Sequence, residues 1–287
     1  MIVVIGGTGN TGRALVKALS VKGLEFKCLV RDVDKAGETL GADVALVQGD
    51  LDDPASLDRA FDGADKVFLN SGHGPALQQQ QKNAIAAAKR AGVAHFVKMS
   101  GSEKAVAADG PSQIMRDHYH VEEALKASGL TWSIVRPNYF LNNVMMFAPT
   151  VSADSKFMSP IAPDAPIAMI DVRDTADCTV AVMSELGHDG KTYYLTGAII
   201  TLNQVAAELS RVLGREITFI NVPWEGAKAA MEKQGMPNWL IAHMGGLAPF
   251  VSDGGMGGPS DWVEKLSGHP PRTLADFLVE HKAAFDG

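Results

Sequence analysis

The feature that most constrains the fold is a regular alternation of short apolar segments with amphipathic segments over the first 137 residues. Runs of Val, Ile, Leu and Phe predict strands, and the segments between them show the helical spacing of apolar residues. Strands that lack a polar face are typical of a parallel sheet covered on both sides. The expected strands span residues 2–6, 26–32, 43–50, 66–72, 94–102 and 131–137, and the expected helices span 11–23, 52–61, 76–92 and 112–128.

This order predicts an α/β protein with a Rossmann-type doubly wound parallel sheet, whose ligand crevice lies at the carboxyl ends of the strands. The rhythm ends after Pro137, where an apolar, proline-interrupted stretch predicts a loop-rich insertion. We expect one structural unit with two parts. Residues 1–137 form the Rossmann core, completed by about 167–196, while residues 138–166 and 197–287 form a smaller, mostly helical part. The glycine-rich stretch from 243 to 262 reads as a mobile flap or a merely flexible loop.

Composition argues against several classes of protein. The net charge of −7 over 287 residues disfavours nucleic-acid binding, which needs a positive surface. The two cysteines, Cys28 and Cys178, lie in apolar stretches and cannot form a disulfide framework, which suits a reducing cytoplasm. No leader and no membrane-spanning run is visible, so we expect a cytoplasmic protein without a membrane partner. The eight histidines show no zinc-ligand spacing, so no metal site is expected.

The strongest local motif is the glycine loop "IGGTGNTG" between the first strand and the first helix. Gly6 permits a sharp turn, Gly9 removes a side chain where a pyrophosphate would approach, and Gly12 lets the helix lie close to the strand. Free N–H groups at the helix N-terminus attract phosphates. The alternative is a purely structural turn. The context favours a dinucleotide site, so residues 1–137 become an NAD(P)-binding core, with Gly7, Thr8, Asn10 and Thr11 completing the loop.

Other cofactor contacts are expected at the ends of the following strands. Arg31 ends the second strand, where a guanidinium suits a 2′-phosphate, so NADP(H) is favoured and NAD(H) is the alternative; the adjacent Asp32 keeps that choice open. Arg31 could instead be a solvated charge. Asp50 and Leu51 follow the third strand, and Ser100 ends the fifth. Small polar residues follow the fourth strand at Asn70, Ser71 and Gly72.

The pattern resembles the NmrA-like group of atypical short-chain dehydrogenase/reductases. The resemblance covers essentially the whole chain and rests on "GGTGNTG", "LVRD", "GDLDD", "HYHVEEAL", "IVRPNYFLNN", "IDVRDTADC" and "GKTYYLTG" with "TLNQVAAELSRVLGR". The layout is most similar to bacterial type 2 quinone oxidoreductases and triphenylmethane reductases, which are NADPH-dependent. The resemblance implies that Pro137, Asn138 and Tyr139 line the nicotinamide pocket. Some members of the group bind the dinucleotide without evident turnover and act as redox-sensing regulators.

Candidate catalytic residues lie on the helix expected at 112–128. Typical short-chain dehydrogenases carry Tyr-x-x-x-Lys there, but Glu123 follows Tyr119 at that spacing, which disfavours the ordinary alcohol-dehydrogenase mechanism. His118 and Glu122 are four residues apart and share a helix face. We expect Glu122 to hold the imidazole and raise its pKa, making His118 a proton donor, although a merely structural histidine is equally compatible. Lys98 is expected to point away from Ser100 and from the site.

The smaller part supplies apolar side chains for a substrate pocket. Aromatic and methionine side chains adapt to flat, varied ligands, although any one of them could equally fill a core. The leading hypothesis is an NADPH-dependent reductase of a quinone-like or other conjugated aromatic acceptor. The alternative is a non-catalytic NADP(H)-binding sensor, and a homodimer is left open. The expected pocket residues are Tyr139, Phe140, Met145, Phe147, Trp224 and Trp239.

Overall fold

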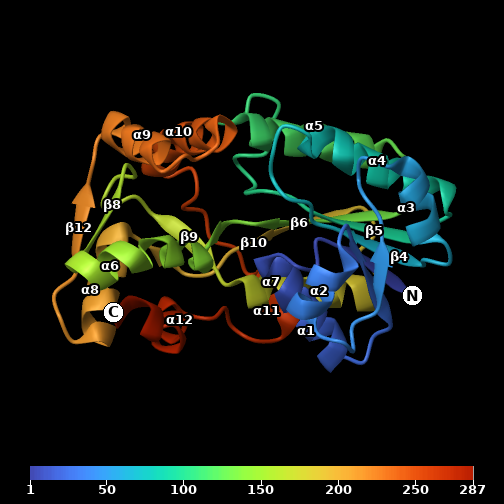
Figure 1. Ribbon diagram of the computed structural model, residues 1–287, viewed down its shortest axis with the longest axis horizontal. Coiled ribbons are helices and arrows are strands. Elements are labelled where there is room, and N and C mark those ends of the chain that lie inside the picture. Colours follow the sequence, from blue (N-terminus) through green and yellow to red (C-terminus); the bar gives the residue numbers. More distant parts are fainter. Residues whose placement is uncertain (287) are drawn as a thin grey trace.

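The computed structural model describes residues 1–286 (Figure 1). Its largest sheet has seven parallel strands in the order β3-β2-β1-β4-β5-β6-β10. This order is doubly wound from β1, so the predicted Rossmann-type fold is confirmed. The strands are β1 (Ile2–Ile5), β2 (Phe26–Val30), β3 (Leu46–Gln48), β4 (Lys66–Leu69), β5 (His95–Met99), β6 (Trp132–Pro137) and β10 (Lys191–Leu195).

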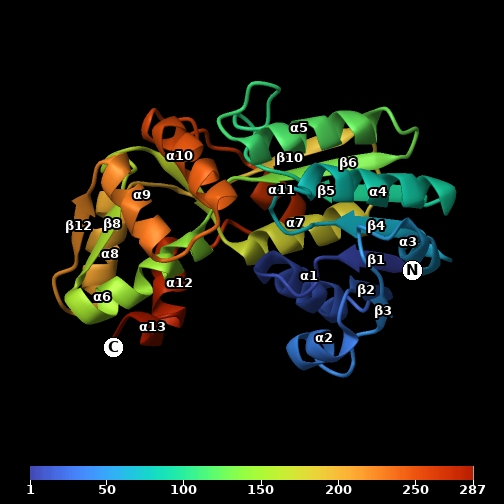
Figure 2. The ribbon, with the colours of Figure 1, turned by 45° about the horizontal axis from the view of Figure 1, so that its top comes forward.

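Helices cover both faces of this sheet, which is why its strands are apolar throughout (Figure 2). Within β1, Val3 belongs to the core beneath one helical layer and Val4 to the core beneath the other. The first layer holds α3 (Pro54–Phe61), α4 (Leu77–Arg90) and α5 (Gln113–Lys126). The second holds α1 (Asn10–Val21), α2 (Val33–Leu40), α7 (Val172–Ser184) and α11 (Trp262–Ser267). The sequence pattern had not indicated α2.

The smaller part lies beside the sheet and has a hydrophobic core of its own (Figure 1). Its chain is mostly helical, as expected, with a three-stranded sheet and a two-stranded parallel pair. The helices are the 3-10 helix η1 (Leu141–Phe147), α6 (Ala148–Asp154), α8 (Leu202–Leu213), α9 (Trp224–Lys233), α10 (Asn238–Ser252), α12 (Leu274–Glu280) and α13 (Ala283–Asp286). The strands are β7 (Tyr139–Phe140), β8 (Lys156–Ser159), β9 (Ile167–Ile170), β11 (Ile199–Ile200) and β12 (Thr218–Asn221).

The stretch after Pro137 is more regular than its composition suggested, because η1, α6, β8 and β9 all fall within the predicted loop-rich insertion. The predicted flap is also wrong in its first half, where α10 runs to Ser252. A Cβ on Gly246 would lie 1.9 Å from the carbonyl oxygen of Pro111, and one on Gly245 would meet the Trp224 ring at 2.6 Å. These glycines therefore allow α10 to pack closely against its neighbours, whereas the glycine content of the sequence had predicted a flexible segment.

The C-terminal chain connects the two parts. Val263 of α11 is fully buried in the core beneath α1 and α7, although its residue range was assigned to the smaller part. Cys28 and Cys178 are buried free thiols in that same core, and burial raises the pKa of each to about 12. Every helix within residues 1–286 is too short or too polar to cross a lipid bilayer.

Candidate active site

A cleft of about 700 Å³ opens at the carboxyl ends of β1, β2, β3 and β4. This is the edge at which ligands bind in doubly wound sheets. His73, Lys35 and Gln80 also line the cleft, and the sequence had not singled them out. The sequence-predicted residues that line it are Gly6, Thr8, Gly9, Arg31, Asp50, Leu51, Asn70, Ser71 and Gly72.

The glycine loop forms a cradle at the base of this cleft. Gly6 has a φ of +82°, and a Cβ on Gly12 would lie 1.9 Å from the carbonyl oxygen of Gly6, so α1 packs directly against the loop. At Gly9 a Cβ would meet nothing closer than 3.6 Å, and the space beside it is open to the cleft. Gly9 caps α1 without any side-chain hydrogen bond, which leaves the helix N-terminus available to an anion.

The outer end of the cleft carries two cationic side chains, Arg31 and Lys35. Asp32 lies between them and caps α2, where its carboxylate accepts a hydrogen bond from the Lys35 backbone N–H at 3.1 Å. Its second oxygen lies 3.4 Å from the Lys35 ammonium. Asp32 also lines the cleft, where it caps α2 and pairs with Lys35, and the neighbouring Arg31 guanidinium is the cleft group best suited to a 2′-phosphate.

Two buried polar atoms lie unpartnered near the ends of β5 and β6. The hydroxyl of Ser100 and the amide oxygen of Asn138 have no hydrogen-bond partner among the described residues. The Asn138 nitrogen donates to the carbonyl oxygens of Ala168 and Met256, both at 2.8 Å, so this side chain also joins the two parts of the molecule. Buried unpaired polar atoms are uncommon, which fits a ligand that would complete them.

Lys98 points toward the site, contrary to expectation. Its side chain is fully buried, and its ammonium donates to His118 Nδ1 at 2.9 Å and to the Met99 carbonyl at 3.0 Å. The prediction was wrong because residues two apart on a strand share a face, so Lys98 lies on the same side as Ser100. The pKa of Lys98 is lowered to about 7, chiefly by burial. The Arg136 charge lowers it further, and the Glu122 charge acts in the opposite direction.

Glu122 does not hold His118, so the predicted pair is also wrong. The fully buried Glu122 carboxylate binds Arg136 of β6 through two hydrogen bonds, from Nε at 3.0 Å and from Nη2 at 2.6 Å. The guanidinium fork is a better partner for a carboxylate than one imidazole nitrogen. Burial and the Lys98 ammonium instead hold the pKa of His118 well below its usual value.

Two further histidines join His118. The His73 ring lies edge-on to His118, with centroids 5.6 Å apart, and edge-on to His243 at 5.9 Å. His243 on α10 shares a hydrogen bond of 2.7 Å with the Ser112 hydroxyl, which caps α5. Burial lowers the pKa of His73 and lowers that of His243 to about 4. No local pattern connects the three histidines, since they come from separate elements.

None of the predicted substrate-pocket residues lines the 700 Å³ cleft, and all except Trp224 pack on one of the three hydrophobic cores. Phe147 stacks on Phe157 with centroids 4.4 Å apart and, like Tyr139 and Met145, packs on the core of the smaller part. Phe140 packs on the core that also holds α7, Trp239 packs on the core that also holds α5, and Trp224 lies close to Gly245. Trp239 lies one helical turn before His243, which puts both on one face of α10.

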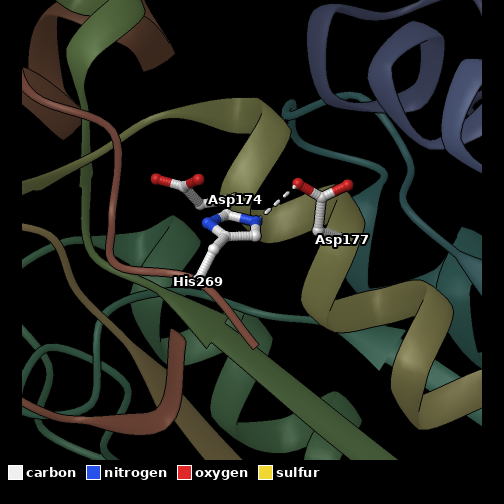
Figure 3. A group of neighbouring side chains, drawn as sticks. All are labelled: Asp174, Asp177 and His269. Atoms are coloured by element: carbon white, nitrogen blue, oxygen red, sulfur yellow. Dashed lines mark hydrogen bonds and ion pairs between the residues drawn. The ribbon is translucent and has the colours of Figure 1, made fainter. Parts of the chain in front are cut away.

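A separate group of side chains lies on α7 and the segment after α11 (Figure 3). Ligand atoms of Asp174, Asp177 and His269 lie within 4.8 Å of one another, close enough to hold a metal ion. However, the Arg272 guanidinium binds Asp177 at 2.9 Å and also pairs with Asp174, and His269 Nε2 lies 3.2 Å from Asp177. Arginine supplies the positive charge that these carboxylates need, so the group ties the C-terminal chain to α7.

Comparison with known proteins gives full-length matches. A model of the NmrA-like family matches residues 1–277. The chain is 37% identical over 286 residues to NAD(P)H azoreductase of Xenophilus azovorans, covering 99% of each. It is 31% identical over 283 residues to Quinone oxidoreductase 2 of Escherichia coli (strain K12), covering 97% of each. The solved structure of the Escherichia coli NADPH-dependent quinone oxidoreductase complexed with NADPH has a TM-score of 0.89 at 30% identity, covering 99% of this chain and 100% of that one.

Proposed function

Because the chain belongs to the NmrA-like family, we propose that it is an NADPH-dependent reductase that transfers hydride to a quinone-like or other conjugated small-molecule acceptor. The full-length relatives named as an azoreductase and a quinone oxidoreductase support this reaction class. The observation that carries the proposal is the position of His73, which lines the cleft and packs 5.6 Å from His118. His118, which can carry a proton, is thus separated from the proposed dinucleotide cleft by the side chain of His73.

The chain fits the dinucleotide at three points. The open space at Gly9 and the uncapped N-terminus of α1 suit the pyrophosphate. Arg31 and Lys35 suit a 2′-phosphate, which favours NADP(H) over NAD(H). The unpartnered Ser100 hydroxyl suits the ribose or the carboxamide at the nicotinamide end.

The dinucleotide, when bound, supplies the hydride. The chain's own residues orient the acceptor, exclude water and move the proton that a reduced quinone or azo group then needs. We assign that proton to His118 Nε2, because Lys98 occupies Nδ1. We place the acceptor beside His73, because this side chain lines the cleft and packs edge-on to both His118 and His243.

The test is NADPH oxidation by the purified protein with a panel of quinones, azo dyes and triphenylmethane dyes, together with calorimetric titration of NADPH and NADH. We expect turnover with at least one acceptor class and tighter binding of NADPH than of NADH. Tight NADPH binding without turnover on any acceptor would overturn the proposal and would favour the non-catalytic sensor.

A further inference from the structure

Lys98 is a buried cation without a buried anion of its own. Its side chain has no exposed surface, and its ammonium hydrogen-bonds only His118 Nδ1 and the Met99 carbonyl within residues 1–286. Glu122 acts on it through charge, but that carboxylate is held by Arg136. Burying an ammonium against neutral partners is unfavourable, so a lysine serving only as packing would be a poor choice at this position.

The hydrogen bond from Lys98 fixes the tautomer of His118. An ammonium has donors and no acceptor, so Nδ1 must accept and the neutral ring carries its proton on Nε2. Burial and the Lys98 charge keep the imidazole neutral by holding its pKa well below the usual value. His118 therefore has a single ring proton, and a neutral imidazole is a weak acid unless Nδ1 gains a proton as Nε2 loses one.

We propose that Lys98 is the proton reservoir of His118, delivering a proton to Nδ1 while Nε2–H is given to the acceptor. The chemical step of this inference rests on the proposed function. After hydride has reached a quinone, the resulting hydroquinone monoanion takes the proton, so the Nε2–H bond breaks and an O–H bond forms. At the same time an Nζ–H bond of Lys98 breaks and an Nδ1–H bond forms.

The step balances without any further reactant. Lys98 is left as a neutral amine, and His118 remains neutral in its other tautomer. Once product leaves, water protonates Nε2 and the Nδ1 proton returns to Lys98, so each turnover takes one proton from solvent. Lys98 acts through His118 and does not touch the acceptor, which makes it a positioning and supplying residue.

The charges around Lys98 set the pH range of the reservoir. Burial and Arg136 of β6 lower its pKa, Glu122 of α5 raises it, and the result is about 7. The ammonium is therefore present below about pH 7 and is lost as the pH rises through this value. From the elements packed opposite, His73 lies against His118 and His243 lies against His73; burial lowers the pKa of His73 and lowers that of His243 to about 4.

The direct test uses the free wild-type protein and needs no turnover. In NMR titrations with lysine labelled at Cε, we expect one lysine signal, absent in Lys98→Met, to titrate near pH 7. Long-range proton–nitrogen spectra should show His118 as the Nε2–H tautomer. A Lys98 midpoint near that of ordinary lysines, or a His118 proton on Nδ1 at pH 6, would overturn the proposal.

The kinetic test compares Lys98→Met with Lys66→Met under saturating NADPH and a quinone. Lys66 is the matched control, because it also donates to a buried carbonyl, that of Met183, but at the other end of the sheet. We expect kcat of the wild type and of K66M to fall as pH rises through about 7. K98M should lose about 100-fold in kcat at pH 6 with little change in KM and should lose that pH dependence.

The double variant K98M/H118A should lose no more than H118A alone, because the two residues act as one unit. Wild-type kcat and an unchanged pH profile in K98M would overturn the proposal. If K98M does not fold, the wild-type His118 tautomer decides, with H118A identifying the His118 signal: a proton on Nδ1 at pH 6 overturns the proposal, and one on Nε2 supports it. A wild type that reduces no acceptor but shows a Lys98 midpoint near 7 would overturn the proposed function while supporting the buried Lys98–His118 pair.

Discussion

A substitution at Gly9 separates a dinucleotide cradle from a purely structural turn. In the free protein, the Cβ of Gly9→Ala would meet nothing closer than 3.6 Å, and the backbone there is extended, which alanine adopts freely. Alanine caps a helix less well than glycine by up to about 1 kcal/mol, and it restricts the unfolded chain by about 0.4–1 kcal/mol in the opposite sense. We therefore expect the free energy of unfolding to stay within about 1 kcal/mol of wild type.

The same methyl group would fill the space in which we place the pyrophosphate. We expect NADPH to bind at least about 10-fold more weakly to G9A, a change of about 1.4 kcal/mol. Gly12→Ala should behave in the opposite way. Its Cβ would lie 1.9 Å from the Gly6 carbonyl oxygen, so helix and loop must separate by about 1 Å, and overpacking of this kind costs about 1–3 kcal/mol of stability before any ligand is added.

The assay is urea unfolding of the free proteins followed by calorimetric titration with NADPH. Gly37→Ala is the control, because Gly37 lies within α2, where an added Cβ would have no atom within 4 Å, and it does not line the cleft. It should gain about 0.5–1 kcal/mol in stability and bind NADPH as wild type does. Wild-type NADPH affinity in a folded G9A protein would refute the cradle and leave the glycines a structural role only.

Three further predictions follow from the site. Replacing both Arg31 and Lys35 with Ala should weaken NADPH binding more than NADH binding in calorimetry, while Arg59→Ala, an exposed arginine on α3, should change neither; equal losses would remove the 2′-phosphate assignment. Glu122→Gln should lower the free energy of urea unfolding by about 2–4 kcal/mol, because it leaves the Arg136 charge unpaired in a largely buried place; a change below about 1 kcal/mol would contradict this. Because the folded-state pKa values of His118 and His243 are lowered, the unfolded chain binds protons first as the pH falls below about 6.5. The free energy of unfolding should therefore decline from there toward about pH 4, by about 1.4 kcal/mol per pH unit for each histidine. A His118→Gln variant with the same slope would show that His118 does not contribute.

The predictable features were those written in neighbouring residues. The sheet follows from apolar runs, and the helix caps follow from local signals. Asp53, which directly precedes Pro54, caps α3 by accepting a hydrogen bond from the Ala55 backbone N–H. The glycine loop could be predicted for the same reason. The turn at Gly6, the open space at Gly9 and the close contact of Gly12 with the Gly6 carbonyl all lie within seven consecutive residues. The side of the sheet on which Lys98 lies is also a local property, because residues two apart on a strand share a face.

Partner choice within the site was beyond the sequence. His118 and Glu122 share a helix face, but Glu122 binds Arg136 from the adjacent strand, and His118 binds Lys98. The spacing of two residues on a helix predicts that their side chains are neighbours. It does not predict which residues of other elements pack against them. The direction of the His118 pKa changed with the partner, from an expected rise to a fall caused by burial and a cation.

The sequence by itself determined the Rossmann-type fold, the glycine loop and the family resemblance, because each rests on residues close along the chain or on the hydrophobic period of a single element. Only the tertiary structure decided which side chains meet at the candidate active site. The Ser112–His243 hydrogen bond spans 131 residues, and the three histidines meet where the loop after β4, helix α5 and helix α10 converge. Burial, which sets the charge of Lys98 and His118, is a property of that convergence, and no stretch of the chain carries it alone.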